Sequence, residues 1–79
     1  MENIETRWTN EARRQLEGRR IVKVRYMTAA EADSLGWGVR AVVMQLDDGN
    51  LIYPSADDEG NDAGALFTNN ERQPVLPVI

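Results

Sequence analysis

The densest group of potential ligand atoms lies between residues 55 and 64, a stretch called the acidic loop below. Within six consecutive residues it places the oxygen-bearing side chains Asp57, Asp58, Glu59, Asn61 and Asp62. Calcium and magnesium prefer such oxygen ligands. The spacing departs from an EF-hand, because the sixth position counted from Asp57 is Asp62, where that motif requires glycine. Metal binding is therefore only a second alternative, and we assign no metal ligands.

We expect the acidic loop to be exposed and to serve a contact with an unidentified protein partner. The other interpretation of the loop is a solvated connector, whose Asp and Asn side chains bond their own backbone. Trp37 follows at the mouth of a predicted hairpin, between Gly36 and Gly38, and is either core or surface. The predicted partner-binding residues are Trp37, Asp57, Asp58, Glu59, Asn61 and Asp62.

The basic side chains gather in the first third of the chain. Residues 1–25 carry seven basic and four acidic side chains, whereas residues 26–79 carry two and nine, so net charges of +3 and −7 make the total of −4. A basic strand beside aromatic residues can bind single-stranded nucleic acid. The residues for this first alternative are Arg13, Arg14, Arg19, Arg20, Lys23 and Arg25. The acidic pI of about 4.6 disfavours it, because the chain as a whole would repel phosphates.

Several reaction mechanisms lack their residues. The sequence has no histidine and no cysteine, so it has no Ser-His-Asp triad, no thiol nucleophile and no zinc site of the usual kind. It also lacks the glycine-rich phosphate-binding motifs. We therefore predict a non-enzymatic protein without catalytic residues or a cofactor. The absence of cysteine, of a long apolar run and of a signal-peptide pattern predicts a cytoplasmic location and no membrane contact.

These residues need a framework, and the 79 residues predict a single domain over positions 1–79. Apolar residues every four positions predict an N-terminal helix over about 4–17, which docks on the rest of the protein through Trp8 and Leu16. Asn3 could cap this helix, or Thr9 or Asn10 a shorter one. The pattern Thr28-Ala29-Ala30-Glu31 is a capping box that starts a short helix ending at Gly36.

The strands are organised around one hairpin over residues 39–54, with its turn at Asp48-Gly49. A two-residue turn places Leu46 opposite Leu51 and puts Val42, Met44, Leu46, Leu51 and Tyr53 on one core face. A three-residue turn with a bulge at Gly49 shifts this pairing by one, and we favour the first. The predicted strands cover about 20–27, 39–46, 51–54, 65–67 and 74–78.

The predicted fold is α+β: a small antiparallel, SH3-like sheet of four or five short strands, bent or closed into a partly open barrel. A helix precedes this sheet, and a short helix lies between its first two strands. The runs Arg25-Tyr26-Met27, Tyr53-Pro54-Ser55, Asp58-Glu59-Gly60-Asn61 and Gly64-Ala65-Leu66-Phe67 resemble short uncharacterised bacterial proteins. This resemblance covers residues 18–67. It implies a compact bacterial domain and no particular substrate or catalytic residue.

Overall fold

The computed structural model describes residues 3–67 and 71–79. The helices are α1 (Ile4–Leu16) and α2 (Ala29–Leu35). The strands are β1 (Ile21–Tyr26), β2 (Val42–Leu46), β3 (Leu51–Ile52), β4 (Leu66–Phe67) and β5 (Val75–Leu76). The predicted α+β class is thus confirmed, with each element inside or close to its expected range.

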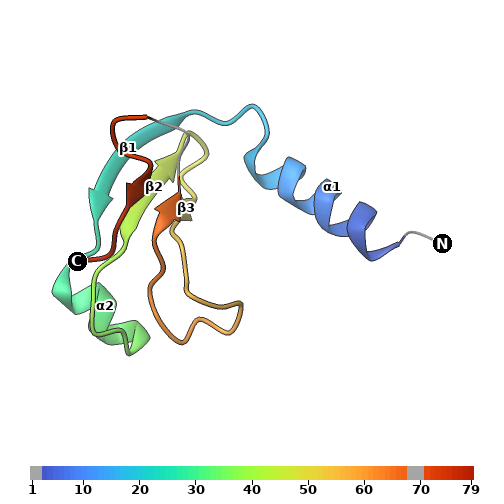
Figure 1. Ribbon diagram of the computed structural model, residues 1–79. Coiled ribbons are helices and arrows are strands. Elements are labelled where there is room, and N and C mark those ends of the chain that lie inside the picture. The colour runs from blue at the N-terminus through green and yellow to red at the C-terminus, as the bar shows by residue number, and fades with distance from the viewer. Residues whose placement is uncertain (1–2, 68–70) are drawn as a thin grey trace.

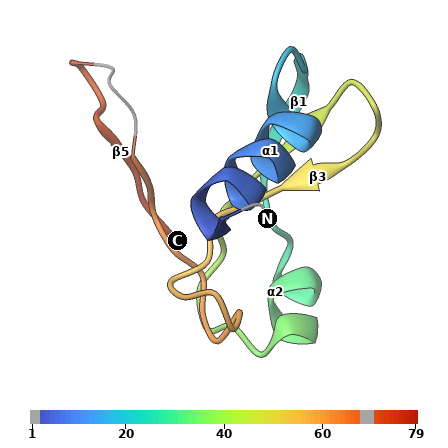
Figure 2. The same ribbon diagram turned by 90° about the vertical axis from the view of Figure 1, so that its right-hand side faces the viewer.

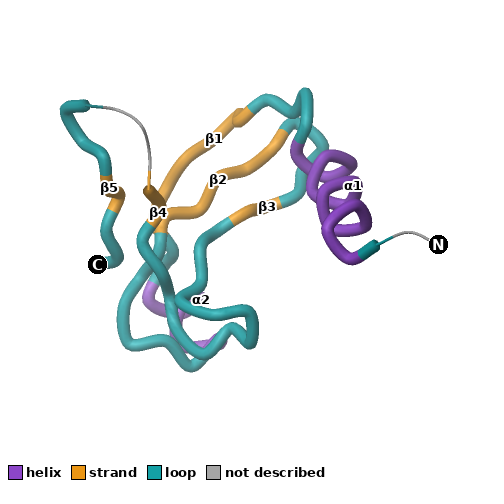
Figure 3. The backbone as a smooth tube through the Cα atoms, turned by 45° about the vertical axis from the view of Figure 1, so that its right-hand side comes forward, coloured by secondary structure: helices purple, strands orange, loops and turns teal. Residues whose placement is uncertain are grey.

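The strands form two antiparallel sheets rather than one barrel. The larger sheet has the order β1-β2-β3, and the smaller one pairs β4 with β5. Figure 2 shows the β4–β5 pair extending away from the larger sheet. Figure 3 traces the segment that leads from β3 to β4 and so connects the two sheets. No closed barrel exists among the described residues, so the structure is an open arrangement of two small sheets.

The β2–β3 hairpin adopts the register that we did not favour. Gln45 pairs with Leu51 and Met44 with Ile52. The amide of Gly49 donates to the carbonyl oxygen of Leu46 (3.0 Å), and Gly49 has a φ of +89°, which places the glycine bulge of a three-residue loop here. This shift by one residue moves alternate side chains to the opposite face of the sheet.

The core therefore differs from the predicted one. Its buried cluster contains Met27, Ala32, Trp37, Ala41, Val43 and Ala63. Val43, which is not on the predicted core face, is buried. Leu51 and Tyr53, which are on that predicted face, are exposed. Val42 and Leu46 are buried but lie outside this cluster. The cluster sits where β2, α2 and the acidic loop meet.

Helix α2 begins and ends as its sequence predicts. The hydroxyl of Thr28 accepts from the amide of Glu31 (3.2 Å), and the carboxylate of Glu31 accepts from the amide of Thr28 (2.8 Å). Gly36 closes the helix in the left-handed conformation, with a φ of +76°. Ala32 of this helix packs into the core. Helix α2 lies at the end of β1, whereas α1 lies at the start of β1 (Figure 1).

Helix α1 forms over its predicted range but does not pack as predicted. Asn3 caps it through a 2.7 Å hydrogen bond from the amide of Thr6. The helix projects from the start of β1 (Figure 1), and none of its residues is buried. Trp8 is 61% exposed and Ile4 is 76% exposed. The expectation that Trp8 and Leu16 dock this helix on the sheet is therefore wrong.

Candidate functional site

The acidic loop has a defined shape, closed at its base by backbone pairing. Ser55 and Ala63 form an antiparallel bridge, and the amide of Ala56 donates to the carbonyl oxygen of Asp62 at 2.8 Å. The hydroxyl of Ser55 donates to the same oxygen, also at 2.8 Å. Gly64 faces Ser55 so closely that a Cβ there would lie 2.8 Å from the Ser55 carbonyl atoms. These contacts hold the two ends of the acidic loop together.

Asp57 organises the interior of the loop. One carboxylate oxygen accepts from the amides of Glu59 and Asn61, each at 3.1 Å, and the other accepts from the Asn61 side chain at 3.1 Å. These hydrogen bonds favour the charged form, so the pKa of Asp57 is lowered, first by the backbone amide of Asn61. Both oxygens of Asp57 are therefore engaged within the loop.

The remaining acidic side chains do not converge. Asp62 accepts from the amide of Ala63 (2.8 Å), and Glu59 accepts from the side chain of Asn61 (3.2 Å). Over residues 3–67 and 71–79, no three Asp or Glu side chains gather where they could hold a metal ion. Asp57, Asp58, Glu59, Asn61 and Asp62 are all exposed. The loop therefore presents separate surface carboxylates.

Trp37 lies beneath the acidic loop and not beside it on the surface. The side chain is only 3% exposed, and its indole nitrogen donates to the carbonyl oxygen of Gly60 at 2.8 Å. Its ring also meets that of Tyr53 edge to face, with centroids 5.8 Å apart. The idea that a partner contacts the Trp37 ring is therefore corrected: the ring is core, and it supports the loop from inside.

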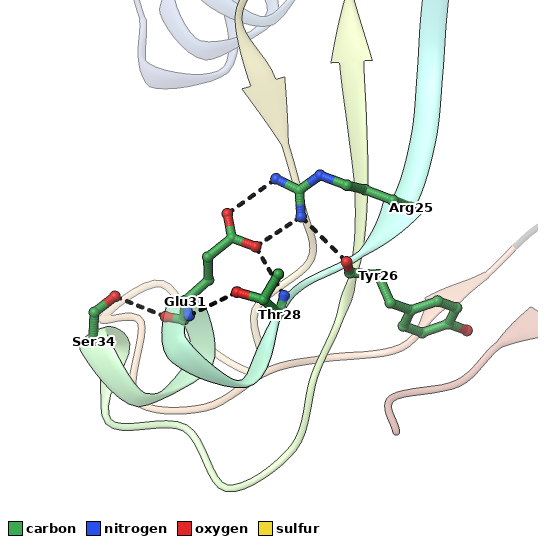
Figure 4. Close-up of polar contacts among 5 residues, drawn as sticks. All are labelled: Arg25, Tyr26, Thr28, Glu31 and Ser34. Atoms are coloured by element: carbon green, nitrogen blue, oxygen red, sulfur yellow. Dashed lines mark hydrogen bonds and ion pairs between the residues drawn. The ribbon is translucent and has the colours of Figure 1, made fainter.

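The basic residues do not form one continuous surface. Arg25 makes two hydrogen bonds to Glu31, at 2.7 and 3.0 Å, and so links β1 to α2 (Figure 4). Arg13 lies 3.7 Å from Glu17, and Arg14 is hydrogen-bonded to Glu11. Phosphates would have to displace these carboxylates, which weakens the nucleic-acid alternative.

The last three basic residues surround the start of β1. Arg19 lies 3.7 Å from Asp47 and 3.4 Å from Asp48. Arg20 and Lys23 are exposed, and neither forms an ion pair within the described part of the chain. Four of the six candidate nucleic-acid residues thus have acidic partners, counted over Arg13, Arg14, Arg19 and Arg25.

The structure shows two exposed apolar surfaces that we did not predict. One, called the α1 stripe, consists of Ile4, Trp8, Ala12 and Leu16, all exposed. The other, called the open half-face, belongs to the β1–β3 sheet and consists of Val22, Val24, Met44 and Ile52. Val22 is 56% exposed and Val24 60% exposed, and Met44 and Ile52 are partly buried. The four-residue spacing in the sequence identified the residues of the stripe. It could not show whether the stripe is exposed, because a docked helix has the same spacing.

The four residues of the open half-face share one side because of the strand register. Val24 pairs with Met44, and Met44 pairs with Ile52, so this row crosses all three strands. Val22 lies beside this row at the point where the β1–β2 register shifts, between Ile21 and Lys23, and it has no paired residue on β2. Lys23 and Arg25 alternate with these valines, so the basic side chains belong to the opposite face.

Comparison of the chain with protein-family models, curated proteins and solved structures gives no match. No helix within the described residues is long and apolar enough to cross a bilayer.

Proposed function

We propose that this chain is a small protein-interaction module without enzymatic activity, and that the α1 stripe is its binding element. The observation that supports this proposal is a projecting helix whose apolar residues, Trp8 included, are exposed. A helix of 13 residues is marginal in water on its own. Contact between the stripe and a partner would stabilise the helix and remove its apolar surface from water.

The stripe has the composition of a binding surface. Trp is among the residues that most often dominate interface energies, because its large ring buries much area with few rotatable bonds. The guanidinium of Arg7 lies over the Trp8 ring, 5.6 Å from its centre, so a cation covers one face of the ring. A helix with such a stripe binds a partner that has an apolar groove or face.

The charged groups support a non-enzymatic role. The pKa of Glu31 is lowered to about 2 by Arg25, and that of Glu11 is lowered to about 2 by Arg14. Each carboxylate is paired with an arginine, Glu11 within α1 and Glu31 between α2 and β1, so neither has the raised pKa that a carboxylic general acid needs. The acidic loop would add long-range attraction for basic partners through its exposed carboxylates.

The finer assignments of this proposal are predictions. They are an SH3-like identity for the open sheets, a bacterial origin and a cytoplasmic location. The SH3-like identity and the cytoplasmic location follow from the sequence patterns described above, and the bacterial origin follows from the resemblance to short bacterial proteins.

The proposal is tested by affinity capture from the native organism with three full-length baits: the natural chain, Trp8→Glu and Asn10→Glu. Asn10 lies on the side of α1 opposite the stripe, and both variants add one negative charge to the same helix. We expect partners that are retained by the natural chain and by Asn10→Glu, and lost with Trp8→Glu. If Trp8→Glu retains every partner, the stripe is not the binding element.

A salt-dependent shift assay on single-stranded DNA and RNA separates this function from the nucleic-acid alternative. We expect no shift at physiological salt. A shift that weakens steeply with salt, and that is lost when Arg20 and Lys23 are both replaced by Gln, would support nucleic-acid binding instead.

A further inference from the structure

The outer edge of β3 carries backbone groups that no other strand uses. The amide of Leu46 donates to the carbonyl oxygen of Asn50 at 2.9 Å, so even-numbered residues of this strand bond to β2. Because the bonding direction alternates along an antiparallel ladder, the backbone groups of Leu51 and Tyr53 point away from β2. None of these groups has a hydrogen-bond partner within the described residues. This row of open groups is called the β3 edge.

The opposite edge of the same sheet is protected against pairing, and the β3 edge is not. Strand β1 has a bulge between Ile21 and Lys23, and Lys23 and Arg25 place charges along it. Bulges and charged side chains on an edge strand oppose the addition of another strand. Residues 51–56 carry no charged side chain. Pro54 lies among them, but alternation directs its missing amide hydrogen away from the open side.

An apolar groove of about 190 Å³ lies beside the β3 edge, between this part of the sheet and α2. The exposed side chains of Leu51 and Tyr53 line it together with Leu35 of α2 and the buried Val43. A strand added at the edge would place alternate side chains on this face, next to Leu51 and Tyr53. The groove can therefore receive an apolar side chain from such a strand.

The acidic loop supplies charge at one end of the β3 edge, because it begins at residue 55, two residues after Tyr53. Its four carboxylates are all exposed. None of them is paired with a lysine or an arginine in the part of the chain that the structure describes. Exposed carboxylates without such partners attract basic groups. A segment on the β3 edge would thus meet an apolar groove and, at one end, uncompensated negative charge.

We propose that the β3 edge binds an extended basic segment of a partner protein, which adds a strand beside Leu51 and Tyr53. One apolar side chain of the segment lies in the groove, and its lysine or arginine side chains lie against the acidic loop. Main-chain hydrogen bonds supply affinity in this mode of binding, and side-chain contacts supply specificity. The site goes beyond the proposed function, because no residue of the α1 stripe lines the groove.

The test begins with random peptides displayed on phage and selected on the immobilised full-length chain. The peptides are about seven residues long, enough to span the edge and reach the loop. We expect the enriched peptides to join an apolar residue to two or more lysines or arginines. Synthetic copies should slow hydrogen exchange at the amides of Leu51 and Tyr53 at least tenfold, because strand addition engages these donors. Selection of no peptide, or of acidic peptides, would overturn the proposal.

Two pairs of variants locate the bound peptide. Leu51→Lys places a positive charge at the groove, and its matched control Val24→Lys does the same at an exposed position of β1. We expect Leu51→Lys to weaken peptide binding at least tenfold and Val24→Lys to leave it unchanged. Equal effects of the two lysines would overturn the site.

The second pair tests the charge and does not alter the groove. Replacing Asp58 by Asn and Glu59 by Gln removes two loop carboxylates, and Glu5→Gln with Glu17→Gln removes two from α1. We expect only the loop variant to weaken binding, at least threefold at low salt, and raised salt should reduce this difference. Binding that is indifferent to the loop variant would overturn the basic segment as the occupant.

The variant Trp8→Glu separates this site from the α1 stripe. We expect it to bind the selected peptides as the natural chain does, whatever the three-bait capture shows. Loss of peptide binding in Trp8→Glu, or exchange protection confined to α1, would overturn the β3 edge and leave the stripe as the binding element. A dimer in sedimentation that the peptides dissociate would assign the edge to a second copy, and would also overturn the proposal.

Discussion

The indole nitrogen of Trp37 donates a 2.8 Å hydrogen bond to the carbonyl oxygen of Gly60, which joins the buried core to the acidic loop across 23 residues of sequence. Gly60 itself has a φ of +75° and lies opposite Asp57 in a tight turn. The buried tryptophan therefore supports the shape of a surface loop whose own contacts are mostly local.

Trp37→Phe keeps an aromatic ring in the core but removes the donor to Gly60. We expect the free energy of unfolding to fall by about 1–3 kcal/mol, from the lost hydrogen bond and the smaller ring. Urea denaturation measures this loss. Hydrogen exchange should also accelerate at the amide of Asn61, within the loop. The control is Tyr53→Phe, which keeps the edge-to-face ring and should change stability little. Equal stability of Trp37→Phe and the natural chain would mean that this hydrogen bond is not formed.

Gly64→Ala tests the close approach at the base of the acidic loop. Its Cβ would lie 2.8 Å from the carbonyl carbon and oxygen of Ser55, closer than such atoms approach. The backbone must shift, and we expect a loss of about 1–3 kcal/mol. Gly38→Ala is the control, because a Cβ at Gly38 meets nothing within 4 Å. Thermal melting of both variants gives the comparison, and an unchanged melting temperature for Gly64→Ala would refute the contact.

Glu31 makes the stability of the body depend on pH. Its pKa is lowered to about 2, first by the hydrogen bonds from Arg25 and then by the amide of Thr28. In an unfolded chain a glutamate has a pKa of about 4.3. Because the folded value is the lower one, the contribution is complete above roughly pH 5 and is lost as the pH falls through 2. Glu31→Gln should therefore flatten the fall of the urea midpoint between these values.

Glu11→Gln is the matched control for this pH dependence. The pKa of Glu11 is also lowered to about 2, here first by Arg14, but both residues belong to the projecting α1. Unfolding followed through the amide signals of β1 and β2 should keep its natural pH dependence in Glu11→Gln. If the two variants behave alike, the Arg25–Glu31 pair does not join β1 to α2.

Removal of residues 1–17 tests whether α1 is independent of the body. None of the described α1 residues is buried, and the core cluster contains none of them. We therefore expect the shortened chain to keep the dispersed amide spectrum of β1–β3 and to stay monomeric. Collapse of that spectrum would show that the helix contributes to the core after all.

Local signals in the sequence predicted local structure well. The capping box at Thr28 and Glu31 and the glycine stop at Gly36 are all present, because each depends on hydrogen bonds between residues a few positions apart. The hairpin turn is also present at Gly49. Its register was wrong because a two-residue and a three-residue loop both place this glycine at positive φ, and the side chain of Asp48 favours the longer loop by accepting from the amide of Asn50 at 3.0 Å.

Packing between distant segments was not predictable in the same way. Trp8 lies in a regular apolar stripe and was expected to be buried, whereas Trp37 lies between two glycines and its place was left open. In the structure Trp37 is buried and Trp8 is exposed. The burial of Trp37 depends on its contacts with the distant residues Gly60 and Tyr53. The residues of the stripe alone do not determine whether another surface packs against them. Of the candidate site, the exposed acidic residues were predictable by their charge, and the open half-face was not.

The contrast between the two tryptophans gives the protein two separate optical reporters. Trp8 emits from a solvated helix and Trp37 from the core, so a soluble quencher such as acrylamide reaches the first ring and not the second. Binding of α1 to any apolar surface would shift the emission of Trp8 to shorter wavelength and leave that of Trp37 unchanged. Unfolding of the body would move the emission of Trp37 to longer wavelength. A single unlabelled sample therefore distinguishes occupancy of the helix from integrity of the fold.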